Sequence, residues 1–435
     1  MTPKALIATI ILVGLFGYAL NSGLHSKQTV PQKHGATVRD FCPHWLPPPP
    51  QKVPGLKNIV SVAFVHKSVL MAVDRDGAAW VYYQGATSCT KAEPFKVFPT
   101  KQSAEEPDAG KLLSVASSLS GAVGVTDTGR ARAIPTDKLK EPPCAGGGTQ
   151  CHYLGDNQIT QEASGRWNEL LLRKDGTVWS WGKNDCGQLG RDVKPLHEWT
   201  TEPVDGLHNA VAVGAGMRNS LVLTRDGTVF AWGNMSDPFF ESVGGTQPVA
   251  NFGYCNGRVN QYYPFLSSDP NPDPREVQGL PPIRAISTFH AFDLALDRDG
   301  HVWGWGYNSC GQLGLEPVGE DPHKIDARMY QASPVRIAGL AHITAIAAGK
   351  RHALALDTEG DVWAWGENGD GELGQQRPAH GSYSCGSEID LTRTSPFSPY
   401  VAKVPGIGKI TAIAAGYNSS AALDENGEVW VWGRH

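Results

Sequence analysis

The same short pattern recurs seven times along this chain of 435 residues, and the repetition constrains the fold more than any other feature. Each copy has a small polar residue, then glycine, then alternating bulky and small residues, as in GTVWSWG from Gly176 and GDVWAWG from Gly360. The glycines lie at positions 77, 129, 176, 227, 300, 360 and 427. A repeat of this period is typical of stacked structural units rather than of one continuous core.

Each copy predicts about four β-strands. Asp-Gly between two apolar runs is the strongest short signal for a β-hairpin, because both central residues of the turn need positive φ. Short apolar runs such as residues 353–356 (ALAL) precede the turn, and alternating runs such as residues 178–181 (VWSW) follow it. Upstream, ITAIAA occurs at residues 343–348 and 410–415 and predicts a further strand, whose small residues allow close packing near an axis. Units of this kind, arranged radially, form a β-propeller.

The two ends of the repeat region complement each other. The last copy stops at Gly433 and lacks the segment that follows this glycine in earlier copies. Residues 53–56 (VPGL) match the strand starts at residues 204–207 (VDGL) and 404–407 (VPGI), so the N-terminal part supplies the missing element. A closed ring would satisfy both edges, whereas an open array would expose two. We therefore predict an all-β fold, a seven-bladed propeller over residues 53–435.

The complete unit resembles the repeat of the RCC1 family, the regulator of chromosome condensation. The resemblance rests on V-x-G-L, I-x-x-I-A-A-G, L-A-L-D-x-x-G and V-W-x-W-G-x-N-x-x-G-Q-L-G, read along one copy. It covers residues 53–433, strongly in copies three to seven and weakly in the first two. The resemblance implies a seven-bladed propeller, and it also implies guanine-nucleotide exchange on a small GTPase, the activity of the family's namesake.

The N-terminal residues predict a hydrophobic helix. Lys4 precedes an apolar run from Ala5 to Leu20, which is the pattern of a signal sequence and is slightly short for a full membrane span. No A-x-A cleavage site follows the run, which favours an uncleaved signal anchor over a cleaved signal peptide or a buried core helix. We expect an anchor over residues 1–23 and a proline-rich spacer over residues 24–52. The protein would then be membrane-anchored and face the periplasm or exterior, or it would be secreted.

Eight cysteines follow this segment, a number that suits an oxidising compartment. Cys144 and Cys151 flank a glycine-rich loop, CAGGGTQC, and are the pair that we predict as a local disulfide. Zinc binding is the rival interpretation, but the six intervening residues match no common zinc spacing. The sequence leaves the partners of the other cysteines open.

Composition and motifs argue against nucleic-acid binding and catalysis. The net charge of −5 lacks the basic excess that a phosphate-binding surface needs. Residues 74–77 and 297–300 (both DRDG) could be calcium loops, but they lie where the hairpin turn requires Asp-Gly. His352 is the single histidine at its repeat position, which favours a structural role. No hydrolase, zinc-protease or P-loop motif occurs, so we expect no metal, no cofactor and no enzyme; a site in the propeller channel is the alternative.

Insertions that depart from the repeat are the predicted binding elements, because binding residues concentrate on loops held by a rigid scaffold. The longest covers residues 234–275 and is rich in aromatic side chains, which commonly anchor protein interfaces. The candidate partner-binding residues are Phe239, Phe240, Phe252, Tyr254, Tyr262, Tyr263 and Phe265. The alternative is that these rings pack on the propeller rim and only order the insertion.

The sequence therefore predicts a non-enzymatic, protein-binding scaffold of the cell envelope or exterior. We expect a monomeric ring that presents one loop-rich face to a protein partner and binds no nucleic acid. Inhibition of an extracytoplasmic enzyme is one alternative, and the guanine-nucleotide exchange implied by the family is another. An exported protein would not meet a GTPase of the cell interior, and for this reason the scaffold is preferred.

Overall fold

The structure is a computed structural model that divides into two units, Met1–Trp45 and Leu46–His435. It describes residues 49–65, 69–83, 93–98, 111–117, 122–128, 131–134, 158–165, 168–184, 186–192, 198–233, 272–316, 330–375, 384–386 and 394–434. The predicted N-terminal helix and anchor, residues 1–23, lie outside these ranges. Within them, no helix combines the length and the apolar character that a membrane crossing requires.

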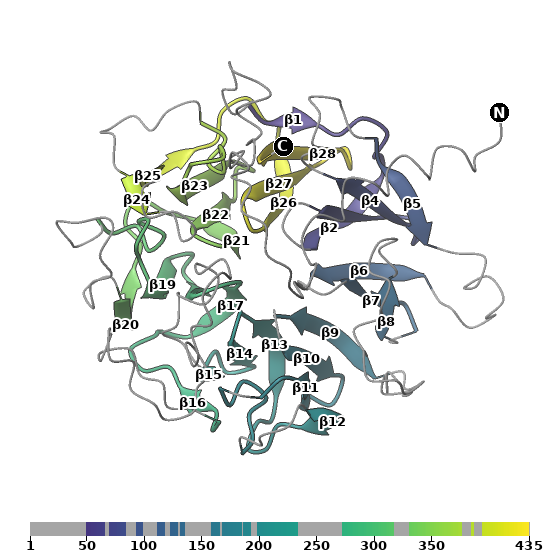
Figure 1. The fold of residues 1–435 in the computed structure, drawn as a ribbon, viewed down its shortest axis with the longest axis vertical. Helices are drawn as coiled ribbons and strands as arrows, with labels where there is room; N and C mark the ends of the chain where they lie inside the picture. Colours follow the sequence, from purple (N-terminus) through teal and green to yellow (C-terminus); the bar gives the residue numbers. More distant parts are fainter. Residues whose placement is uncertain are drawn as a thin grey trace, which may run out of the picture. The chain divides into compact units, whose positions relative to one another are not determined.

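Seven antiparallel sheets make up the described part of the second unit, and we number them as blades along the chain (Figure 1). Blade 1 contains β2 (Ile59–Val65), β3 (Val69–Asp74), β4 (Ala79–Tyr83) and β5 (Phe95–Phe98). Blade 2 contains β6 (Leu112–Ser117), β7 (Ala122–Thr126) and β8 (Ala131–Ile134). Blade 3 contains β9 (Ile159–Ser164), β10 (Asn168–Arg173), β11 (Val178–Gly182) and β12 (Glu198–Pro203). Blade 4 contains β13 (Ala210–Ala215), β14 (Asn219–Thr224), β15 (Val229–Gly233) and β16 (Arg275–Glu276).

The remaining blades follow the same order of strands from the inside outward. Blade 5 contains β17 (Ile283–Thr288), β18 (Phe292–Asp297), β19 (Val302–Tyr307) and β20 (Tyr330–Arg336). Blade 6 contains β21 (Ile343–Ala348), β22 (His352–Asp357), β23 (Val362–Glu367), β25 (Thr394–Lys403) and β24 (Ser384–Gly386). Blade 7 contains β26 (Ile410–Ala415), β27 (Ser419–Asp424), β28 (Val429–Gly433) and, at its outer edge, β1 (Gln51–Lys52).

The inner strands of neighbouring blades contact each other all the way round: β2, β6, β9, β13, β17, β21 and β26, with β26 against β2 again. The predicted all-β propeller is therefore confirmed. Six blades have four strands or more, whereas blade 2 has three in the described residues. The prediction of seven complete blades is to this extent not met.

A strand from each end of the repeat region closes the ring within blade 7. β1 pairs with β28, with Gln51 opposite Val431 and Lys52 opposite Trp430. The next residue, Val53, donates its backbone N–H to the carbonyl of Val429 at 2.8 Å. Val53 and Leu56 are then buried in the apolar layer between blades 7 and 1. The closure therefore combines strand pairing with burial of apolar side chains.

Buried tryptophans join three of the blades to the loop of the preceding blade. The second tryptophan of the V-W-x-W-G strand is fully buried in blades 4, 6 and 7. Its indole N–H donates to a backbone carbonyl in the G-Q/E-L-G loop of the blade before, which explains why the two motifs recur together. The pairs are Trp232 with Gln188 (3.0 Å), Trp365 with Gln312 (2.9 Å) and Trp432 with Glu372 (2.8 Å).

An aspartate at the end of the second strand organises the hairpin turn in four blades. In blade 6, Asp357 accepts hydrogen bonds from the backbone N–H groups of Glu359 and Asp361, and from the indole N–H of Trp363, each at 2.9 Å. Gly360 of the same turn has φ +84°, a value that glycine adopts without a Cβ clash. The same aspartate–tryptophan hydrogen bond joins Asp74 to Trp80, Asp297 to Trp303 and Asp424 to Trp430.

Replacing Asp357 with alanine is expected to lower the free energy of unfolding by about 1–3 kcal/mol, because one partly buried indole and two turn amides lose their acceptor. Chemical denaturation of the purified protein measures this value. Glu359→Ala in the same turn is the control, since the Glu359 side chain is exposed and its change should cost less than about 0.5 kcal/mol. Equal losses for both variants would contradict the proposed role of the carboxylate.

Candidate protein-binding surface

A ring of seven exposed side chains marks one edge of the inner strands. In each blade the register between the first and second strands shifts at the second residue of the inner strand, as in a β-bulge. The first residue of each inner strand is buried and the second is exposed. We call these second residues the rim: Val60, Leu113, Thr160, Val211, Arg284, Thr344 and Thr411.

Threonine has a structural function in three of the rim positions. In each case the hydroxyl group donates a hydrogen bond to the backbone carbonyl of a leucine in the second strand of the same blade. The threonines are Thr160, Thr344 and Thr411. The distances are 3.2 Å to Leu172, 3.0 Å to Leu356 and 3.1 Å to Leu423. A polar, β-branched residue is thus what the bulge itself favours.

Blades 1, 2 and 4 carry aliphatic side chains at this position instead. Val60, Leu113 and Val211 are 44%, 56% and 42% exposed, and they are three of the five large hydrophobic side chains found exposed in the described residues. Their side chains have no hydroxyl group, so they cannot donate the hydrogen bond to the leucine carbonyl that threonine donates at this position. Val60 and Leu113 belong to adjacent blades, and Thr160 of blade 3 separates them from Val211 of blade 4. We call these three residues the apolar arc.

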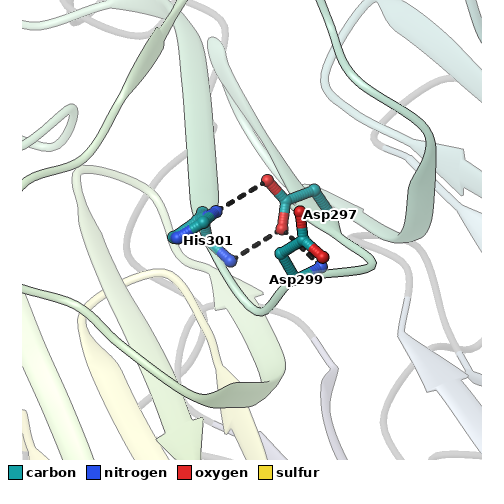
Figure 2. Close-up of side chains that lie close together, drawn as sticks. All are labelled: Asp297, Asp299 and His301. Carbon is teal, nitrogen blue, oxygen red and sulfur yellow. Dashed lines mark hydrogen bonds and ion pairs between the residues drawn. The ribbon is translucent and has the colours of Figure 1, made fainter.

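The hairpin of blade 5, next to rim residue Arg284, brings three possible metal ligands together. Ligand atoms of Asp297, Asp299 and His301 lie within 4.8 Å of one another (Figure 2). The Asp297 carboxylate, however, already accepts hydrogen bonds from the backbone N–H groups of Asp299 (3.0 Å) and His301 (2.8 Å). It also bonds to His301 Nδ1 at 3.1 Å and to the indole of Trp303 at 3.0 Å.

These hydrogen bonds identify the cluster as the hairpin turn already seen in blade 6. Burial alone would raise the pKa of Asp297, but the hydrogen bonds from Trp303 and His301 outweigh it and the pKa is lowered. Ala78, Asp361 and Glu428 occupy the position of His301 in other blades, where the turn has the same geometry. The interpretation of residues 297–300 as a turn therefore fits the structure better than a calcium loop.

His352 lies at a contact between blades 6 and 7. It is buried, and its Nε2 lies 3.1 Å from the hydroxyl oxygen of Ser420. Ser420 is also buried, and its hydroxyl donates to the carbonyl of Glu372 at 2.8 Å. Burial lowers the pKa of His352 to about 3. A neutral histidine bonded to a buried serine that solvent does not reach supports packing between blades rather than nucleophilic chemistry.

The site residues predicted from the sequence are not among the residues that the structure describes. Cys144 and Cys151 fall outside the described residues. So do the aromatic candidates, which are Phe239, Phe240, Phe252, Tyr254, Tyr262, Tyr263 and Phe265. Their predicted roles stay predictions. Sequence reasoning missed the rim, although one signal was available. The residue after the first isoleucine of ITAIAA is threonine in two copies, and its counterparts in the apolar arc are valine or leucine.

Comparison with known proteins decides what the repeats are. A family model described as "Regulator of chromosome condensation (RCC1) repeat" matches residues 175–223 and 299–356. A second model with that description matches residues 159–188, 210–237, 343–372 and 410–435. The chain contains RCC1 repeats. The repeat units predicted from glycine spacing and the V-W-x-W-G strand are thus confirmed in these segments.

Several known proteins are similar to this chain over part of their length. It is 27% identical over 301 residues to the RCC1 domain-containing protein RUG3, mitochondrial, of Arabidopsis thaliana, covering 60% of this chain and 62% of that protein. It is 27% identical over 283 residues to the guanine nucleotide exchange factor SRM1 of Saccharomyces cerevisiae, covering 64% and 53%. It is 30% identical over 282 residues to the human probable E3 ubiquitin-protein ligase HERC6, covering 63% and 23%. The chain thus spans less than two thirds of each of these relatives.

The solved structure of Prp20p from Saccharomyces cerevisiae has a related fold. It superposes with a TM-score of 0.57 at 18% sequence identity, over 86% of this chain and 82% of that one. At this identity the likeness establishes the propeller fold and nothing about activity.

The relatives correct two predictions made from the sequence. The predicted location, anchored in a membrane and facing the cell envelope or exterior, is wrong. The predicted function as a scaffold of that compartment is also wrong. The similar proteins include one named as mitochondrial and one named as a guanine nucleotide exchange factor. The physical reason is that an apolar run after a lysine describes the chemistry of an N-terminal segment and does not by itself identify a compartment.

Proposed function

We propose that this protein binds a small GTPase and promotes exchange of its guanine nucleotide. The proposal is supported by the RCC1 repeats and by similarity to SRM1, a guanine nucleotide exchange factor. Prp20p, which has a related fold, itself has binding properties to Gsp1p and histones. Exchange makes and breaks no covalent bond, so the function requires a binding surface and no catalytic constellation.

The apolar arc is the observation that carries the proposal. An exchange factor lowers the affinity of a GTPase for its nucleotide by binding the nucleotide-free form more tightly, and the coupling is reciprocal. Its effect is therefore limited by the binding free energy that its surface supplies. Val60, Leu113 and Val211 offer exposed apolar area on three blades of a rigid ring, which is the type of contact that dominates protein interfaces.

Release of fluorescent GDP from a panel of small GTPases, in excess unlabelled GTP, tests the function. We expect the protein to accelerate release from at least one GTPase. The variant with Val60→Thr, Leu113→Thr and Val211→Thr should lower the second-order rate constant by about 50-fold, because each lost apolar contact costs about 0.8 kcal/mol. Threonine occupies the equivalent position in three other blades, so this variant should fold normally.

Thr344→Val is the matched control, since it lies on the rim outside the apolar arc and should leave the exchange rate within about twofold. A folded triple variant with an unchanged rate would place the binding surface elsewhere. If no GTPase of the panel responds to the unmodified protein, the proposed function itself is wrong.

A further inference from the structure

Two cysteines occupy the same place in the repeat. Cys186 of blade 3 and Cys310 of blade 5 are the third residues of the N-x-C-G-Q-L-G loops that follow the third strands. The backbone N–H of each donates to an equivalent acceptor, the side-chain oxygen of Gln188 or Gln312, at 2.8 Å. Both side chains are fully buried, and both cysteines are disulfide-bonded. The two loops therefore direct a cysteine to equivalent places in the ring.

Residues at this loop position contact the following blade. The Sγ of Cys186 lies 3.7 Å from Nη1 of Arg218, in the turn between β13 and β14 of blade 4. In blade 6 the equivalent residue is Asp370, and its carboxylate accepts a hydrogen bond from the side-chain N–H of Asn418 in blade 7. Cys310 packs against Phe397 of blade 6. The loop thus bridges neighbouring blades, and a cysteine here is placed to bridge them covalently.

Cys385 lies on the strand next to the one that Cys310 contacts. It belongs to β24 and pairs with Ser395 of β25, two residues before Phe397 (Figure 1). The backbone beside Cys310 is also close to β25, since a Cβ on Gly311 would come within 2.8 Å of Pro399.

We propose that Cys310 and Cys385 form a disulfide that fastens β24 of blade 6 to the loop of blade 5. The bond joins the two Sγ atoms; two protons are released and two electrons pass to an oxidised disulfide, such as glutathione disulfide, which is reduced to thiols. The bond does not depend on the proposed exchange activity.

A tryptic map of the intact, non-reduced chain, alkylated before digestion, tests the pairing. Cleavage after lysine and arginine, except before proline, places Cys310 in peptide 299–324 and Cys385 in peptide 352–393, each as its single cysteine. We expect one species with the summed mass of these peptides, which separates on reduction. An alkylated Cys310, or its linkage to any other peptide, overturns the proposal.

The variant Cys385→Ser supplies an independent readout. It should leave one new thiol, on Cys310, that reacts with a maleimide only after denaturation, and it should lower the Tm by about 5 °C through loss of the cross-link. Ser384→Ala on the same short strand is the control and should change neither the thiol count nor the Tm. An unchanged thiol count in Cys385→Ser would show that Cys310 has a different partner.

Discussion

Replacing Glu367 with alanine is expected to lower the free energy of unfolding by about 3–5 kcal/mol, the largest loss that we expect from a single change. Glu367 ends β23 and forms a two-point ion pair with Arg351, with Oε2 at 2.9 Å from Nε and Oε1 at 2.6 Å from Nη2. Both side chains are almost completely buried. Without the carboxylate, a guanidinium that cannot lose its proton stays in a site of low polarity.

Lys403→Ala provides the control for this experiment. Lys403 pairs with Asp361 in the same blade, but its side chain is 54% exposed, so water screens the pair. We expect a much smaller loss than for Glu367→Ala in the same denaturation experiment. Comparable losses for the buried and the exposed pair would contradict the argument that burial sets the cost.

Replacing His352 with asparagine is expected to remove an acid-sensitive contribution to stability. Burial lowers the pKa of His352 to about 3, whereas the unfolded chain has the ordinary value of about 6.5. Between these two values the unfolded state binds the proton and the folded state does not, so stability falls as the pH is lowered through this window. At pH 4 the effect amounts to about 3 kcal/mol.

Asparagine is the conservative replacement because the repeat already uses it there. Asn168 of blade 3 donates to the hydroxyl of Ser220 in blade 4 at 2.8 Å, as His352 bonds to Ser420. Unfolding free energies at pH 7 and pH 4 give the measurement. The fall in stability between the two should be smaller in the variant by about 3 kcal/mol. An equal fall in both proteins would show that His352 is protonated in the folded state.

The buried carboxyl group of Asp293 changes the stability with pH in the opposite direction, and its contribution cancels when the two proteins are compared. It is buried between blades 4 and 5, and burial raises its pKa to about 6. The folded state therefore binds the proton first, so this group adds stability at low pH that is lost as the pH rises through about 6. Because Asp293 is present in both proteins, its contribution cancels in the difference.

The hairpins show how far the sequence determines the fold. Asp-Gly at residues 226–227 and 299–300 predicted turns between the second and third strands, and the structure has them there. The aspartate two residues before this pair, as in Asp357 relative to Glu359, had no predicted role, although its spacing to Trp363 repeats in four copies. Local turn chemistry is encoded within a few residues, and so a single copy suffices to recognise it.

The candidate site was harder to predict because it depends on a bulge within each blade. Exposure of Val60, Leu113 and Val211 follows from a bulge in each inner strand, and a bulge leaves no distinct signal in a run such as IVSVAFV at residues 59–65. The pattern there reads as a continuous apolar strand, for which burial is the natural expectation. Only alignment of the seven copies would have drawn attention to the position.

The pairing of β1 with β28 also sets an order of events during translation. β1 is among the first strands that the ribosome produces, yet its partner, residues 429–433, is made after six other blades. Throughout that interval Val53 and Leu56 have no apolar layer of blade 7 to cover them. Until residues 429–433 are made, the nascent chain has an unpaired β1 edge and exposed apolar side chains. This condition favours aggregation and chaperone binding. A ribosome that stalls before residue 429 would release a chain whose ring cannot close.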